Sequence, residues 1–316
     1  MRKICNRLFL ALFGLALAAV PAFTLARPEK KISYYENRAL AEKPALTGEN
    51  VRTGQYFSGW DTWLSDHIVG RNTILKSYAR IQRALPKVEA NNIIETGSGA
   101  LLLMASPEDY DPQEQKEIMD KKTGELKALA GHVQDYGGLF CYVGVPGQRY
   151  VYYDEYPEYL SIGRSLVDYC EGRVFDALAD TDAVAVNMRE VFDATGDAKR
   201  YYSALDNHYN YDGVLLTYRT LMKAINERLD TPLKVYEDRD LVFHTEEQEF
   251  FGSYSRRICN LQARKEHLVW AEPKESVPFT REDGHVRVPA NTFEQPDPAV
   301  STYAGYMGGD IGETVI

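Results

Sequence analysis

The first 26 residues contain the chain's longest apolar run. Three basic residues come first, and an apolar stretch from Leu8 to Ala26 follows. A basic start before an apolar stretch is typical of an export signal, and this run approaches the ~20 residues that cross a bilayer. Small residues at Ala22 and Ala26 permit cleavage. Residues 1–26 are therefore predicted to be a cleaved signal peptide or a retained signal-anchor. The remainder is predicted to be exported, anchored or secreted, at the extracellular face of the cytoplasmic membrane or in the periplasm.

The next two segments differ in their polar pattern. Residues 27–54 are polar and contain two prolines and Gly48, which predicts an extended stalk or arm. In residues 55–85, apolar side chains recur three and four positions apart, which predicts one helix closed by Pro86. The apolar positions of this helix are Phe57, Trp60, Trp63, Leu64, Ile74, Tyr78 and Ile81. Aromatic residues at helical spacing are most often part of a core.

The middle of the chain alternates short β-rich runs with helical patterns. Residues 93–104 predict a hairpin, and residues 112–133 an amphipathic helix. Residues 139–146 and 183–186 are apolar runs typical of buried parallel strands. The helices predicted around them cover residues 163–179, 188–192 and 213–229, the last with Asp212 as its N-cap. Alternating strands and helices predict an α/β fold with a mostly parallel sheet and flanking helices.

One α/β domain is expected over residues 55–316, with 235–298 as an irregular insertion because the pattern weakens there. The chain has 36 basic and 46 acidic residues, and the three charged residues among the first 26 are all basic, so the exported part has a net charge of −13. This balance argues against nucleic acid as a partner and against simple electrostatic docking on anionic lipid. Cys141, Cys170 and Cys259 follow the export segment; their odd number leaves the disulfide pairing open.

The segment 201–213 contains the strongest candidate for chemistry. Asp206 and His208 are two positions apart, which places both side chains on one side of an extended loop. A carboxylate beside an imidazole fixes its tautomer and stabilises its charged form, as the general base for a serine hydroxyl requires. The structural alternative is a simple hydrogen bond within a surface loop.

A metal site is not expected in this segment. Asp206, Asn210 and Asp212 offer oxygen ligands, but an EF-hand loop needs Gly at its sixth position and Glu at its twelfth. Those positions hold Tyr211 and Thr217. The six histidines are scattered, whereas zinc sites use closely spaced His and Cys ligands. No metal and no cofactor are therefore predicted.

Short motifs are spread over about 280 residues of the chain. They are Glu36-Asn37-Arg38, Asp66-His67 with Arg71, Val145-Pro146, Asp206-Asn207-His208-Tyr209 with Gly213, Phe251-Gly252-Ser253-Tyr254 and Tyr306-Met307-Gly308-Gly309-Asp310. In this order they resemble the bacterial DHHW family, which is related to the SGNH-hydrolase-like proteins of alginate O-acetylation. The family's namesake motif is Asp-His-His-Trp, and this chain keeps Asp206 and His208 but has Asn207 and Tyr209 at the other two places.

The resemblance implies an SGNH-hydrolase-like, flavodoxin-like fold in which Asp206 orients His208 and His208 activates a serine. It implies an acyl esterase or O-acyltransferase that acts on an extracellular polysaccharide, beside a membrane-bound O-acyltransferase. In the family the serine follows the Gly-Gly-Asp match on a further strand, whereas this sequence stops at Ile316. We therefore expect a fold that is incomplete at the C-terminus and a fragment that is inactive for lack of the nucleophile. The alternative is a non-catalytic protein that binds glycan or acts as a scaffold in an envelope O-acylation complex.

Three further residues are candidates for substrate contact. Ser253 follows a glycine in a turn, where it is a pocket-lining residue, an ordinary turn residue or a substitute nucleophile; the strand-turn-helix pattern of a nucleophile elbow is lacking. Tyr152 and Tyr153 lie in a run of tyrosines and acids after a predicted strand. Such a run suits carbohydrate binding, and tyrosine is equally common as a half-buried structural residue.

Overall fold

The structure is a computed structural model that describes residues 2–104, 111–160, 165–275, 278–283, 286–291 and 314–315. It divides into two compact units. Unit 1 comprises Met1–Asn91 and Arg256–Leu261, and unit 2 comprises Asn92–Ser255 and Gln262–Ile316.

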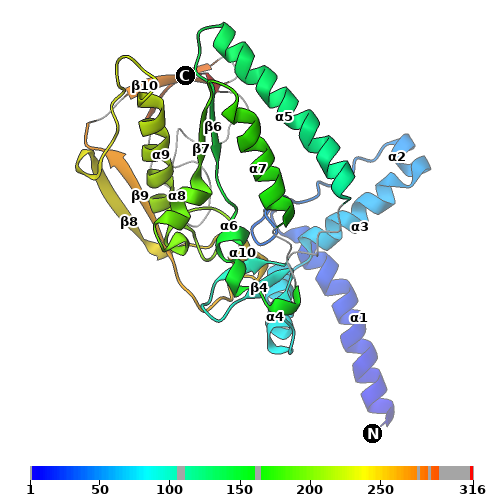
Figure 1. The fold of residues 1–316 in the computed structure, drawn as a ribbon. Helices are drawn as coiled ribbons and strands as arrows, with labels where there is room; N and C mark the ends of the chain where they lie inside the picture. The colour runs from blue at the N-terminus through cyan, green and yellow to red at the C-terminus, as the bar shows by residue number, and fades with distance from the viewer. Residues whose placement is uncertain are drawn as a thin grey trace. The chain divides into compact units, whose positions relative to one another are not determined.

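Unit 1 begins with a long helix, α1 (Arg2–Ala26), drawn in dark blue in Figure 1. Within it, the 21 residues Asn6–Ala26 are long and apolar enough to cross a membrane. Most of the apolar side chains of α1 are exposed, with Leu10 at 64% and Phe13 at 52%. This helix has the length and composition that the sequence predicted for a signal or anchor.

The segment after α1 is folded rather than extended. A two-residue antiparallel pair joins β1 (Ile32–Ser33) and β2 (Arg38–Ala39). The short helix α2 (Gly48–Thr53) follows, because the Thr47 side chain accepts a hydrogen bond from the Asn50 amide and caps its first turn. The prediction of an extended arm over residues 27–54 is therefore corrected.

The single helix predicted over residues 55–85 is divided into α3 (Gln55–His67) and α4 (Arg71–Ala84). The break falls at Gly70, whose φ of +80° is left-handed and favours glycine. Trp63 is 1% exposed, as expected of a core residue. Beyond α4 the chain forms the short strand β3 (Glu89–Ala90).

Unit 2 starts with the expected hairpin of β4 (Ile93–Glu95) and β5 (Leu101–Leu103), which pair antiparallel. The helix α5 (Pro112–Asp135) begins after Asp111, whose carboxylate accepts the amides of Gln113 and Glu114. Together these elements confirm the predicted hairpin and the predicted amphipathic helix.

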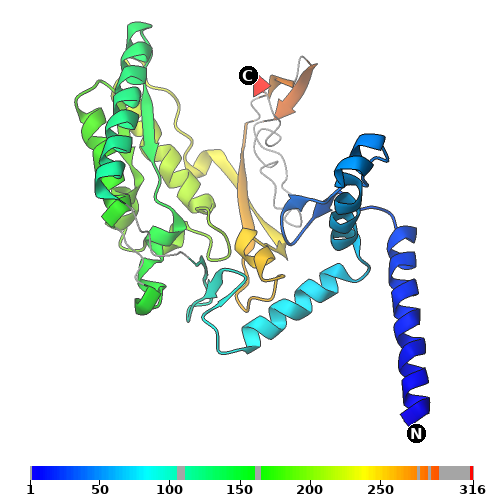
Figure 2. The same ribbon diagram turned by 90° about the vertical axis from the view of Figure 1, so that its right-hand side faces the viewer.

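The centre of unit 2 is a parallel pair, β6 (Cys141–Gly144) and β7 (Val184–Asn187). The helix α7 (Ser165–Ala179) connects them, and residues 163–164 of its predicted range lie outside the described residues. After β7 come α8 (Met188–Ala194) and α9 (Tyr211–Asn226). Figures 1 and 2 show α5 and α7 on one side of the pair and α8 and α9 on the other. This layered arrangement is the α/β fold that the sequence predicted.

Other pairings of the described strands, including β4 with β5 and β8 (Leu241–Glu249) with β9 (His267–Pro273), are antiparallel, so fewer strand pairs are parallel than the sequence predicted. Within the segment 235–298, for which the sequence predicted an irregular insertion, β8 pairs antiparallel with β9, with a register shift between Thr245 and Glu249. Further strands pair antiparallel: β10 (Pro278–Asp283), β11 (Val286–Asn291) and β12 (Thr314–Val315). Short helical turns complete the fold: α6 (Gln148–Val151), η1 (Tyr153–Glu155), η2 (Glu158–Leu160), η3 (Ala198–Tyr201), η4 (Asp238–Asp240) and α10 (Ser253–Arg257).

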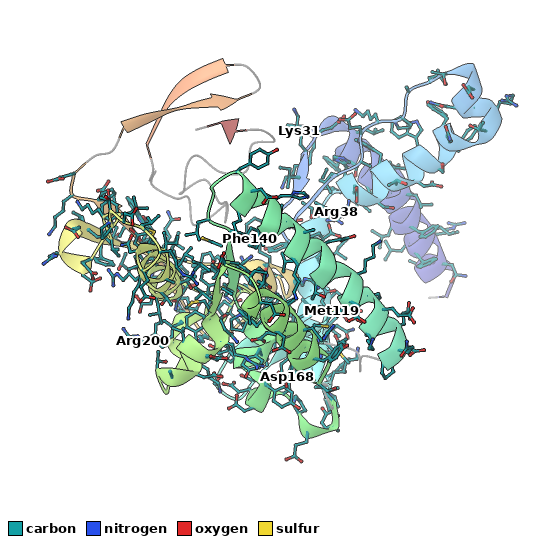
Figure 3. The ribbon with its side chains drawn as sticks, turned by 45° about the horizontal axis from the view of Figure 1, so that its top comes forward. Lys31, Arg38, Met119, Phe140, Asp168 and Arg200 are labelled. Atoms are coloured by element: carbon teal, nitrogen blue, oxygen red, sulfur yellow. The ribbon has the colours of Figure 1, made fainter. Side chains whose placement is uncertain are left out.

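The main core of unit 2 lies between β6–β7 and the surrounding helices. Val184 and Val186 of β7 pack there with Phe192 of α8, which is fully buried. Met119 on α5 and Asp168 on α7 are labelled in Figure 3 and mark the outer helices. The segment that carries Asp206 enters this core through Tyr202 and Ala204.

Candidate active site

The loop that contains Asp206 and His208 is closed at its base like a hairpin. Tyr202 and Tyr209 form an isolated antiparallel bridge, and the Ser203 amide donates to the carbonyl of His208 at 3.2 Å. The loop starts from η3, which Arg200 marks in Figure 3, and ends at Asn210. Its base therefore fixes the positions of the residues between 203 and 208.

The same loop lies beside the carboxyl end of β6. The Tyr202 hydroxyl donates to the carbonyl of Pro146, two residues beyond β6. At the other end, Asn210 rather than the predicted Asp212 caps α9, because the Asn210 side chain accepts the Gly213 amide at 3.1 Å. In open α/β sheets, this edge is where ligands bind.

A glutamate distant in sequence holds the first half of the loop. Glu266 accepts the Ser203 hydroxyl at 2.6 Å and the Ala204 amide at 2.8 Å. On the opposite side, the amide of Leu101 in β5 donates to the Ala204 carbonyl at 2.7 Å. Because Ala204 and Leu205 are fully buried, these bonds satisfy backbone groups that water does not reach.

Asp206 is 6% exposed, and its carboxylate is surrounded by donors. Its Oδ1 accepts the Asn207 amide at 2.6 Å and the Ser253 hydroxyl at 2.8 Å, and its Oδ2 accepts the Ser253 amide at 3.2 Å. Burial alone would raise the pKa of Asp206, but the hydrogen bonds from His208 and Ser253 lower the pKa below its ordinary value. The carboxylate is therefore ionised at neutral pH.

His208 lies against this carboxylate, with Nδ1 3.2 Å from Asp206 Oδ1. Since an ionised carboxylate only accepts hydrogen bonds, Nδ1 carries the proton and Nε2 of the neutral ring is the basic nitrogen. The bond to Asp206 raises the pKa of His208, against the opposite effect of partial burial. The His208 side chain is 50% exposed while that of Asp206 is 9% exposed. The pair thus joins a buried acid to an accessible base.

Gly252 and Ser253 form the other wall of the Asp206 site. A Cβ at Gly252 would lie 2.5 Å from the Leu205 carbonyl oxygen and 2.6 Å from Asp206 Cβ. Only glycine fits this approach without a shift of the backbone. The approach places the amide and hydroxyl of Ser253 on the two carboxylate oxygens. Ser253 thus donates to Asp206 with its amide and its hydroxyl, and its predicted contact with substrate stays a prediction.

The two tyrosines predicted to contact substrate lie elsewhere. Tyr152 is 2% exposed and packs in the core with Phe192, and burial raises its pKa to about 12. Its ring is therefore a structural element, and the prediction of a substrate contact is corrected. Tyr153 opens η1, partly buried against the same core. Among the side chains that the structure describes, no group of three His, Cys, Asp or Glu residues forms a candidate metal site.

A second polar cluster gathers the first two motifs of the sequence within unit 1. Arg38 donates to both oxygens of Asp66, at 2.9 and 2.6 Å, and Arg71 Nη2 lies 3.8 Å from Asp66 Oδ1. The hydrogen bond from Arg38 is the main cause that lowers the pKa of Asp66 to about 2. A pocket of about 250 Å³ adjoins this cluster and is lined in part by Asp66, His67 and Arg71. No residue of the Asp206 loop contributes to it.

Comparison with solved structures shows the fold. The structure of Bacillus cereus PatB1 with a sulfonyl adduct superposes with a TM-score of 0.54 at 16% identity, over 73% of this chain and 74% of PatB1. A second PatB1 structure gives a TM-score of 0.51 at 17% identity, over 70% of this chain and 74% of PatB1. The O-acetyltransferase domain of Pseudomonas putida AlgJ gives 0.46 at 12% identity, over 58% of this chain and 66% of that domain. The predicted α/β fold is thus confirmed.

Sequence comparison adds no family. No protein-family model and no curated protein matches the chain.

Sequence reasoning found Asp206 and His208 but missed the groups that hold them. Glu266 is 60 positions beyond Asp206 and stands among ordinary charged residues. Gly252 belongs to the motif at residues 251–254. A glycine directly before a candidate serine can indicate that the backbone closely approaches another segment there.

Proposed function

We propose that this protein is a cell-envelope acyl esterase or O-acyltransferase of the SGNH-hydrolase-like type, acting on an extracellular polysaccharide. The observation that carries the proposal is the contact between Asp206 Oδ1 and His208 Nδ1 at 3.2 Å, with the carboxylate buried and the imidazole accessible. The motif order that resembles the DHHW family supports it. The likeness of fold to PatB1, for which a sulfonyl adduct is described, is consistent with it.

In this proposal His208 is the general base and Asp206 orients it. Nε2 of His208 removes the proton from a nucleophilic hydroxyl as that oxygen bonds to the acyl carbonyl carbon. The alcohol of the first ester leaves with the proton from His208. Water or a sugar hydroxyl then attacks the acyl-enzyme, which gives hydrolysis or transfer. Asp206 stabilises the imidazolium that exists between these steps.

The nucleophile is assigned to a residue other than Ser253. The Ser253 hydroxyl donates to Asp206 Oδ1 at 2.8 Å and lies 3.0 Å from Asn207 Oδ1. A serine that is hydrogen-bonded to the carboxylate holds Asp206 in place, whereas a nucleophile has to reach Nε2 of His208.

The proposed partners of the protein are the polysaccharide and a membrane-bound O-acyltransferase that supplies the acyl group.

The test is acyl-ester turnover by a protein that includes the serine implied by the DHHW resemblance. We expect release of p-nitrophenol from p-nitrophenyl acetate, transfer of acetyl to a polysaccharide acceptor, and loss of both by at least a hundredfold in His208→Ala. His244→Ala is the matched control, because His244 also pairs with a carboxylate, Glu272 at 3.0 Å, but stacks on Trp270 in a strand. Turnover that is lost in His244→Ala but kept in His208→Ala would contradict the proposal, because the reaction would then depend on the His244–Glu272 pair.

A covalent trap identifies the nucleophile. Phenylmethylsulfonyl fluoride forms an O–S bond with the activated hydroxyl while the S–F bond breaks, fluoride leaves and His208 takes the proton. Peptide mass spectrometry of the treated protein should find the sulfonyl group on a hydroxyl residue other than Ser253, and no such group in His208→Ala. Absence of both turnover and sulfonylation, with retained polysaccharide binding, would favour a non-catalytic glycan-binding or scaffolding role.

A further inference from the structure

Helix α4 carries an apolar stripe that stays exposed in the described part of the chain. Its members are spaced four, three and four residues apart, so they share one side of the helix. They are Ile74 (58% exposed), Tyr78 (57%), Ile81 (59%) and Leu85 (46%), the last just past the helix end. The same helical pattern suggested core residues in the sequence. In the structure the buried side of α4 is instead centred on Ala79, which is 4% exposed.

The charges of α4 are all of one sign. The helix has four basic residues, Arg71, Lys76, Arg80 and Arg83, and no acidic residue. At 100° per residue, Lys76, Arg80 and Arg83 lie on roughly the opposite side of the helix from the apolar stripe. A basic amphipathic helix of this kind is typical of a membrane surface.

The net charge of the chain is divided unevenly between its two units. Beyond the first 26 residues, unit 1 has 13 basic and 7 acidic residues, a net charge of +6. Unit 2 has 20 basic and 39 acidic residues, a net charge of −19. The negative net charge that argues against docking on anionic lipid therefore comes from unit 2. Unit 1 taken by itself is complementary to an anionic surface.

Within unit 1, α4 begins beside the end of α1. The amide of Val69 donates to the Thr24 hydroxyl at 3.1 Å, and Thr24 is 3% exposed. Thr24 lies two residues before the end of the apolar span at Ala26, and Val69 lies two residues before α4. In Figure 2, α4 (cyan) starts near the end of α1 (dark blue) and runs obliquely away from it. A bilayer crossed by α1 has its surface where the apolar run ends, which is where α4 starts.

We propose that α4 is an interfacial helix that lies on a bilayer of anionic phospholipid. Ile74, Tyr78 and Ile81 enter the boundary between headgroups and acyl chains, and the long side chains of Lys76 and Arg80 extend to the lipid phosphates. The contact between Thr24 and Val69 sets the depth of α4 by joining its start to the end of the spanning helix. This proposal does not depend on the proposed catalysis.

The test uses the full chain in lipid nanodiscs, with Tyr78→Trp as the probe and Phe57→Trp as the matched control. Both positions are exposed aromatics of unit 1, at 57% and 62%, so neither substitution disturbs a core. Phe57 lies in the first turn of α3, ten residues before its end, or about 15 Å along the helix from the junction with α4. The signal of the three native tryptophans is subtracted using the unsubstituted protein.

With brominated lipids containing phosphatidylglycerol, we expect quenching at position 78 at least twofold stronger than at position 57. In nanodiscs of zwitterionic phosphatidylcholine alone, and in Arg80→Glu, the difference should shrink. Equal quenching at the two positions overturns the proposal. A photoreactive group at position 78 that cross-links to a second copy of the chain, or to unit 2, also overturns it, because the stripe is then covered by protein.

Discussion

The Ser253 hydroxyl donates a 2.8 Å hydrogen bond to Oδ1 of Asp206, the same oxygen that lies 3.2 Å from His208 Nδ1. Ser253 also donates its amide to the second oxygen of the carboxylate. A buried carboxylate is stable in its charged form only when such donors compensate for lost water. The segment around residue 253 therefore keeps Asp206 ionised, which in turn sets the basicity of His208.

Asp206→Asn should separate the effect of the negative charge of Asp206 from the effect of its size. The amide keeps the size of the side chain but removes the charge that raises the pKa of His208. Because a general base acts in its neutral form, activity of the parent should rise with pH through the raised pKa of His208. In the variant that rise should move to lower pH, and turnover should fall about 10²–10⁴-fold.

A pH–rate profile and the NMR titration of His208 measure both effects. Asp212→Asn is the control, because Asp212 is half-exposed and pairs with Arg200 rather than with a histidine. An unchanged titration of His208 in Asp206→Asn would contradict the assignment of the carboxylate as its partner.

Ser253→Ala should weaken activity without abolishing it. The variant loses one hydrogen bond to a charged group, a contribution of about 1.5–3 kcal/mol, while the amide of residue 253 still donates to Asp206. We expect turnover to fall about 10–100-fold and the pKa of Asp206 to rise toward its ordinary value. Ser253→Thr keeps the hydroxyl and should retain most of the activity. A loss equal to that of His208→Ala would instead identify Ser253 as the nucleophile.

Gly252→Ala should destabilise unit 2. The added methyl group would lie 2.5 Å from the Leu205 carbonyl oxygen and 2.6 Å from Asp206 Cβ, so the backbone has to shift. Overpacking of this kind costs about 1–3 kcal/mol. Gly147→Ala is the matched control, since nothing lies within 4 Å of its Cβ position and its φ of −69° suits any residue. Urea unfolding of both variants measures the difference in the free energy of unfolding. Equal stabilities would contradict a close contact between the backbone at residue 252 and Asp206.

The sequence predicted the elements whose signals are local. The strands at 141–144 and 184–187 are short apolar runs, and α5 and α9 have strong helical periodicity, so each was found within a few residues. The Asp206–His208 pair was also predictable, because two positions on one side of a loop lie close together in any extended conformation.

Other features depend on partners that are distant along the chain. The break at Gly70 interrupts a helical pattern that continues on both sides, and it is fixed by a left-handed glycine that periodicity does not detect. Ser253 is hydrogen-bonded to Asp206, 47 positions earlier in the sequence, and Glu266 is hydrogen-bonded to Ala204, 62 positions earlier. Tyr152 was a candidate for substrate contact because it lies in a run of tyrosines and acids, yet the core of unit 2 buries it. Side-chain roles of this kind follow from tertiary packing, which single-sequence patterns do not contain.

Unit 1 should lose stability in acid through Asp66. Hydrogen bonds from Arg38, assisted by the Ala41 amide, lower the pKa of Asp66 from 3.8 to about 2. A depressed pKa stabilises the folded state above the unfolded pKa, and this stabilisation is lost as the pH falls from about 4 to about 2. The full shift corresponds to about 2.5 kcal/mol. Because Arg38 is 44% exposed and solvent screens it, we expect about 1–2 kcal/mol.

Asp66→Asn should therefore lower the free energy of unfolding by about 1–2 kcal/mol at pH 7 and by progressively less as the pH falls toward 2. Trp63, buried in unit 1 and stacked on His67, reports the unfolding through its fluorescence. Asp61→Asn is the control on the exposed side of the same helix. If the difference between Asp66→Asn and the parent protein stays constant from pH 7 to pH 2, the stabilisation comes from packing of the side chain rather than from its charge.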